Sequence, residues 1–181
     1  MNILVLNCGS SSVKYKLIEI KANKVLAEGG VEKIGLPNCF IKLKLNDGSK
    51  KEIHLSANDH EGAIEAILHY LTSKEYGCIS SYDEIDAVGH RVVHGGERFN
   101  KSMLITEEVK ETIKECYGIA PLHNPVNMAG IEAISTIMPN VPQVAVFDTA
   151  FHQTMEPKAF RYPIPNEYYT VDHVRRYGFH G

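Results

Sequence analysis

The sequence predicts an α/β domain with a mixed β-sheet flanked by helices. The opening part of the chain contains only strand-like segments, and helical and strand-like segments alternate after it. The composition is that of an ordinary globular protein, because 44% of the 181 residues are hydrophobic and 23% are charged. A chain of this length can bury a sizeable core in one domain, or in one domain and part of another.

The chain begins with a strand, a polar turn and a second strand. Apolar residues 3–6 lead into Asn7, Gly9 and three serines, and residues 13–17 alternate between apolar and polar side chains. A P-loop is not supported, because no second glycine precedes Lys14 and a tyrosine follows it. The hydroxyls and the ammonium suit an anion, but an ordinary serine-rich hairpin turn explains the same residues equally well.

Further strands are expected before the first helix. Residues 25–34 form one, and residues 40–45 and 52–55 form a hairpin around the turn at Asp47 and Gly48. The helix after them has apolar side chains at helical spacing over residues 63–71. Its start is predicted by a capping box, which Asn58 and Glu61 form.

The second half of the chain alternates strand and helix. Residues 86–93 form a strand, Thr106 caps a helix that ends at Gly118, and Asn124 caps another that starts with Pro125. Pro139 stops that helix, and residues 144–147 form a short buried parallel strand. Several prolines interrupt the pattern beyond residue 151, with at most a short helix at residues 172–176. The abrupt ending predicts a truncated chain.

Charge and cysteine content exclude some classes of partner. The net charge of -3 disfavours binding to nucleic acid or to an anionic membrane, and no apolar run approaches the length of a membrane span. The cysteines are widely spaced and predict reduced thiols in a cytosolic protein rather than disulfides or a zinc site. They are Cys8, Cys39, Cys78 and Cys116.

The segment around Arg91 carries a possible acid-binding pair. In a strand Arg91 and Val93 share one face, and His90 and His94 share the other. A guanidinium beside a small apolar wall suits a short carboxylic acid. A metal site at the two histidines is disfavoured, because an i, i+4 pair needs a helix, and the β-branched residues and glycines oppose one.

Three other polar residues lie where ligands bind. Asp148 follows an apolar strand, at the edge where open α/β sheets hold ligands, although it could equally cap the next segment. His123 precedes a helix start, which has spare amide donors for an anion. His180 lies in a loop flanked by glycine, where a single histidine is more often incidental than catalytic.

Taken together, five segments resemble the acetate kinase family. They are NxGSSSxK at 7–14, GHRVVHGG at 89–96, PLHNP at 121–125, VFDTAFH at 146–152 and RRYGFHG at 175–181. The resemblance implies the ATPase fold of actin, hexokinase and Hsp70, which is ribonuclease H-like, with two related domains and an active site between them. Residues 1–150 would form the amino-terminal acetokinase domain, and residues 151–181 would begin the second, truncated domain.

The resemblance also implies an activity. The family transfers the γ-phosphoryl group of ATP to acetate, reversibly and with Mg²⁺ as cofactor, which gives acetyl phosphate and ADP. A cytoplasmic protein that forms a homodimer at full length is expected, with neither nucleic acid nor a membrane as partner. A kinase for propionate or another short carboxylate is the alternative. The isolated chain, which lacks part of the cleft, would be inactive or would serve as a non-catalytic anion-binding module.

Residue roles follow from the matching motifs. Asn7 would help to place Mg²⁺ and the phosphates, and His123 would assist at the phosphate. Arg91 would bind acetate and stabilise the transition state, and His180 would also stabilise the transition state. The remaining roles belong to Ser10, Ser12 and Lys14 at the nucleotide's phosphates, and to Val93, Leu122 and Phe179 around the acetate methyl group.

Asp148 would be the active-site acid. Acetate is already ionised at neutral pH, so a general base has no proton to remove from it. We therefore expect Asp148 to act chiefly by ordering Mg²⁺ and its waters.

Overall fold

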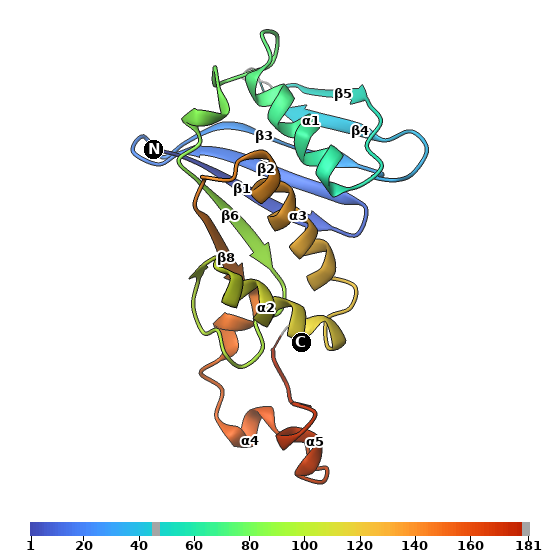
Figure 1. Ribbon diagram of the computed structural model, residues 1–181, viewed down its shortest axis with the longest axis vertical. Helices are drawn as coiled ribbons and strands as arrows, with labels where there is room; N and C mark the ends of the chain where they lie inside the picture. Colours follow the sequence, from blue (N-terminus) through green and yellow to red (C-terminus); the bar gives the residue numbers. More distant parts are fainter. Residues whose placement is uncertain (45–47, 179–181) are drawn as a thin grey trace.

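The computed structural model describes residues 1–44 and 48–178, and its centre is an eight-stranded mixed sheet (Figure 1). The strand order is β5-β4-β3-β2-β1-β6-β8-β7. The strands are β1 (Asn2–Gly9), β2 (Ser12–Glu19), β3 (Lys24–Glu32), β4 (Phe40–Lys44), β5 (Lys50–His54), β6 (Ala87–Val92), β7 (Met103–Leu104) and β8 (Gln143–Phe147). The predicted mixed sheet is therefore confirmed.

The sheet has an antiparallel part and a parallel part. Strands β1 to β5 pair antiparallel in chain order, whereas β6 runs parallel to β1 and β8 runs parallel to β6. The carboxyl ends of β1, β6 and β8 consequently lie at the same edge of the sheet. The β4–β5 hairpin is confirmed by its pairing, although Asp47 of the expected turn lies outside the described residues.

The main helices are amphipathic and pack on one face of the sheet (Figure 1). They are α1 (His60–Thr72), α2 (Glu107–Glu115) and α3 (Asn124–Ile137), and the short helices α4 (Pro157–Phe160) and α5 (Glu167–Thr170) follow. Short 3-10 helices occur at Tyr82–Glu84, Cys116–Gly118 and Asp148–His152. None of the helices in the described ranges combines the length and the hydrophobicity that a membrane-spanning helix needs.

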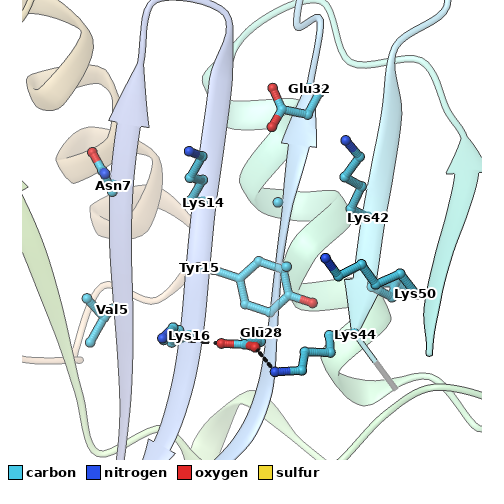
Figure 2. A pocket seen from close by; sticks show the side chains of 13 residues that line it. Val5, Asn7, Lys14, Tyr15, Lys16, Glu28, Glu32, Lys42, Lys44 and Lys50 are labelled. Atoms are coloured by element: carbon cyan, nitrogen blue, oxygen red, sulfur yellow. Dashed lines mark hydrogen bonds and ion pairs between the residues drawn. The ribbon is translucent and has the colours of Figure 1, made fainter. Parts of the chain in front are cut away.

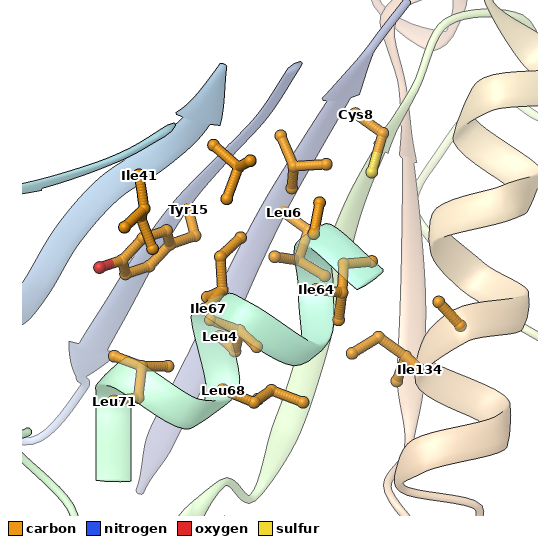
Figure 3. Packing of buried hydrophobic residues seen from close by; sticks show 14 of the residues in the cluster. Leu4, Leu6, Cys8, Tyr15, Ile41, Ile64, Ile67, Leu68, Leu71 and Ile134 are labelled. Atoms are coloured by element: carbon orange, nitrogen blue, oxygen red, sulfur yellow. The ribbon is translucent and has the colours of Figure 1, made fainter. Parts of the chain in front are cut away.

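The core lies between the sheet and helices α1 and α3, and Figure 3 shows its packing. Leu4 and Leu6 of β1 meet Ile64 and Ile67 of α1 there, and these four side chains are 0–1% exposed. Because side chains alternate along a strand, residues such as Val5 project from the opposite face. Among the described residues no helix covers that face, which we call the open face.

Two predicted helix caps are wrong in detail. The Asp59 carboxylate, and not the side chain of the predicted Asn58, accepts the capping hydrogen bond from Gly62 N at 2.9 Å. Asn124 does not cap α3 but is its first residue, and it turns its fully buried side chain inward. The sequence pattern identifies a capping residue type within one position, but tertiary contacts decide which side chain faces the helix end.

The last part of the chain also differs from the prediction. Pro157 begins α4, a position that proline tolerates, and residues 172–176 contain no helix. The segment is held instead by Arg175, which is 9% exposed, forms an ion pair with Glu97 and lies 3.6 Å from the Phe160 ring centroid. Hydrogen bonds from Arg175, His173 and Tyr169 outweigh the effect of burial and lower the pKa of Glu97.

Candidate active site

Three polar side chains meet at the carboxyl ends of the three parallel strands. They are Asn7 in β1, Arg91 in β6 and Asp148, which directly follows β8. Arg91 Nη2 lies 2.6 Å from Asp148 Oδ2, and Arg91 Nε lies 3.0 Å from Asp148 Oδ1. Arg91 Nη1 also donates to Asn7 Oδ1 at 3.3 Å. Parallel pairing thus brings together residues that are far apart in the sequence.

This cluster is partly open to solvent, and the guanidinium is more exposed than the carboxylate. The Arg91 side chain is 45% exposed, whereas that of Asp148 is 24% exposed. The hydrogen bonds to Asp148 raise the pKa of Arg91, so the guanidinium stays charged. A charged guanidinium offers paired N–H donors to a carboxylate or a phosphate, and Arg91 Nη1 has only the longer contact to Asn7.

The serine turn lies next to this cluster. Asn7 pairs with Lys14 and Gly9 pairs with Ser12 in the β1–β2 hairpin, so these side chains share one end of the sheet. Figure 2 shows Asn7 and Lys14 beside each other in a groove of about 440 Å³ on the open face. The His60 ring holds the turn from the other side, because its Nε2 atom lies 2.7 Å from Gly9 O.

The side chains of this turn are available for a ligand. Within the described ranges, the hydroxyls of Ser10 and Ser12 and the ammonium of Lys14 make no hydrogen bond or ion pair with protein atoms. The neighbouring Lys16 and Lys44 differ, because both are paired with Glu28 (Figure 2). An unpaired ammonium beside free hydroxyls suits phosphate oxygens.

Two buried asparagines of α3 hold the loop after Arg91. Asn124 Oδ1 accepts from His94 N at 3.1 Å, and Asn124 Nδ2 donates to His94 O at 2.9 Å. Asn127 Oδ1 accepts from Val93 N at 3.0 Å. These bonds bring the segment before α3, with Leu122 and His123, close to the end of β6.

The other predicted residues are placed in part. Val93 lies just beyond the end of β6 and is buried. Strand alternation therefore does not extend to Val93, and it does not place Val93 on the same face as Arg91. Leu122 is 75% exposed, and His123 precedes the first residue of α3. Phe179 and His180 lie outside the described residues.

His90 and His94 are neutral, buried side chains. His90 Nε2 donates to Gln143 Oε1 at 2.8 Å, and His94 Nδ1 accepts from Gly96 N at 3.0 Å. Burial lowers the pKa of each imidazole to about 4. No group of three metal-ligating His, Cys, Asp or Glu side chains occurs in the described residues.

Because these two histidines are buried and neutral, we expect the free energy of unfolding to depend on pH. An unfolded histidine has a pKa near 6.5, so between about pH 6.5 and pH 4 only the unfolded chain binds the proton. The free energy of unfolding is therefore full above that range and falls as the pH decreases, by roughly 2 kcal/mol per histidine at about pH 5. Urea unfolding at several pH values measures this, and His90→Gln should remove about half of the slope. An unchanged slope in that variant would contradict the assignment.

Several functional contacts were not predicted from the sequence. Arg91 and Asp148 were predicted as separate candidates, although both follow buried residues on neighbouring parallel strands, and that pattern was the available signal for their contact. The inward-facing Asn127 and the contact of His60 with Gly9 carry no local sequence signal.

Known proteins resemble this chain over its whole length. A family model described as the acetokinase family matches residues 2–181. The acetate kinases of Bacteroides fragilis and Phocaeicola vulgatus are 57% and 58% identical over 181 residues, which is 100% of this chain and 46% of each relative. The chain thus spans about half the length of these curated relatives.

Solved structures of acetate and propionate kinases also resemble this chain. The crystal structure of Porphyromonas gingivalis acetate kinase matches with a TM-score of 0.95 and 54% identity, over 99% of this chain and 45% of that chain. A propionate kinase from Francisella tularensis matches with a TM-score of 0.90 and 43% identity, again over 99% of this chain and 45% of that one. The fold expected from the five motifs is confirmed.

Proposed function

Because this chain belongs to the acetokinase family, we propose that it supplies the amino-terminal half of the active site of an acetate kinase. The reaction is the reversible transfer of the γ-phosphoryl group of ATP to acetate. The observation that carries the proposal is the meeting of Arg91, Asp148 and Asn7 at one sheet edge, beside the unpaired side chains of the serine turn.

Different residues of the chain bind the two substrates, acetate and ATP. Arg91 binds the acetate carboxylate and stabilises the charge that develops during transfer, since a guanidinium can bond two oxygens at once. Ser10, Ser12 and Lys14 bind the nucleotide's phosphates, and His123 assists there. Val93, Leu122 and Phe179 surround the acetate methyl group, and His180 joins Arg91 at the transferred group.

The donor set fits a magnesium ion. Mg²⁺ is bound through one or two carboxylates, waters and substrate phosphates. Asp148 and the Asn7 amide oxygen both accept hydrogen bonds from the Arg91 guanidinium, so they lie near each other. The Asp148 oxygens keep lone pairs beyond their bonds to the guanidinium. Asn7 and Asp148 would hold the ion, which would neutralise charge on the phosphates. Acetate needs no deprotonation, so Asp148 orders the site and does not act as a general base.

A substrate panel tests the proposal. The enzyme form to assay joins residues 1–181 to the carboxyl-terminal part of the Bacteroides fragilis acetate kinase; we call it the extended chain. It should phosphorylate acetate with a kcat/KM about 10- to 200-fold higher than propionate, the range that one methylene group controls. The 181-residue chain alone should not turn over. A folded extended chain that phosphorylates neither acid would contradict the proposal.

A propionate kinase is the second candidate, because the Francisella tularensis protein of that name is 43% identical to this chain. Preference for propionate in the same panel would favour it. An anion-binding module without turnover would bind phosphate but show no product with any acid.

Three further points belong to the proposal. Residues 1–150 form the amino-terminal domain, and residues 151–181 begin the second domain. The full-length protein is a homodimer, as the family resemblance implies. It works in the cytoplasm, which the four free thiols support, since disulfides are rare there.

A further inference from the structure

We propose that Asn127 is a positioning residue that fixes the distance between the phosphate-binding turn and the acid-binding Arg91. The inference rests on the proposed function and adds a residue outside the five motifs. Asn127 lies in α3 and is 3% exposed. Its side-chain amide bonds backbone groups at the ends of two neighbouring strands. Oδ1 accepts from Val93 N, just beyond β6, and Nδ2 donates to Cys8 O in β1, each at 3.0 Å.

The two strands have no direct backbone pairing at this level. The parallel register of β1 and β6 ends with Leu6 opposite His90, one residue before Asn7 and Arg91. Beyond that point the strand ends that carry the site are joined by side chains. The Asn127 amide therefore joins the two backbones where the backbone pairing of the sheet has ended and the site begins.

Other contacts make this bridge rigid. Helix α3 lies so close to β1 that a Cβ atom on Gly130 would be 2.5 Å from Cys8 Sγ. Asn124, one turn earlier in α3, bonds both backbone groups of His94. Because α3 packs against both β1 and β6, the amide of Asn127 holds the backbones of Cys8 and Val93 at a fixed distance from each other.

This separation matters for phosphoryl transfer. Cys8 lies between Asn7 and Gly9 of the phosphate-binding turn, and Val93 is two residues after Arg91. In-line transfer needs the carboxylate and the phosphate in contact, and an error of about 1 Å can cost about 100-fold in rate. Each substrate keeps its own binding groups when the bridge is lost, so kcat should fall while each KM changes little.

The test uses two substitutions in the extended chain. Asn127→Leu keeps the branched shape of the side chain with a larger volume and Asn127→Ser reduces the volume, but both remove the two hydrogen bonds. Each should lower kcat about 30- to 100-fold and change the KM for acetate and for ATP by less than about threefold. The matched control is Gln143→Met, which also removes a buried amide with two hydrogen bonds, to His90 and Ser135, at the start of β8, far along the strand from Asp148.

The control separates positioning from loss of stability. Gln143→Met should lower the unfolding temperature but leave kcat within about twofold. Exchange of the Val93 amide hydrogen in the 181-residue chain should accelerate at least about tenfold in both Asn127 variants, relative to Val13 in β2. The inference is overturned if folded Asn127 variants match the control in kcat, or if the Val93 amide stays protected. An inactive unsubstituted extended chain would overturn the proposed function and the kinetic part of the inference with it.

Discussion

Replacing Arg91 with alanine in the extended chain should lower kcat by about 10³- to 10⁵-fold, the range that an arginine at a transferred phosphoryl group supplies. The KM for acetate should rise as well, because the carboxylate loses its two-pronged donor. Arg91 is the centre of the cluster and contacts both Asp148 and Asn7, so no other described side chain replaces it. Steady-state kinetics with acetate and ATP varied separately measure both effects.

Arg91→Lys is the matched control for charge. A lysine keeps the positive charge but cannot place two parallel donors, so it should recover only a small part of kcat. Folding should be little affected, because an ion pair with a side chain 45% exposed contributes at most about 1 kcal/mol. A change confined to ATP affinity would contradict the assignment of Arg91 to the acid.

Much of the fold could be predicted because each element has a local signal. The alternation after Ser12 predicted β2, and the short apolar run at residues 144–147 predicted a parallel strand, which β8 confirms. The tail could not be predicted in the same way. Its conformation depends on the ion pair between Arg175 and Glu97, which are 78 residues apart.

The candidate site could be predicted by residue type but not by arrangement. Arg91 and Asp148 each had a local argument, whereas their pairing depends on the register of β6 with β8. Asn124 had a capping signal that the structure overrides, because its side chain bonds the backbone of His94. Bonds that join distant segments leave no periodic pattern in the sequence.

Asp148→Asn is the second substitution with a large expected effect. It should lower kcat by about 100- to 1,000-fold, the loss typical of one preorganised electrostatic contact. The Mg²⁺ concentration needed for half-maximal rate should rise, because an amide is a weaker ligand for a hard cation than a carboxylate. If the variant kept most of its activity at saturating Mg²⁺, neither a role at the ion nor a role as the active-site acid would stand.

A double-mutant cycle with Arg91→Ala separates two ways in which Asp148 can act. Its carboxylate holds the guanidinium through Nε and Nη2, so part of its effect must pass through Arg91. If that were the whole effect, the double variant would lose no more than Arg91→Ala alone. We expect a further loss that depends on Mg²⁺ concentration, because the Asp148 oxygens keep lone pairs beyond their bonds to the guanidinium. If the double variant had the same kcat as Arg91→Ala at every Mg²⁺ concentration, Asp148 would act only by orienting Arg91.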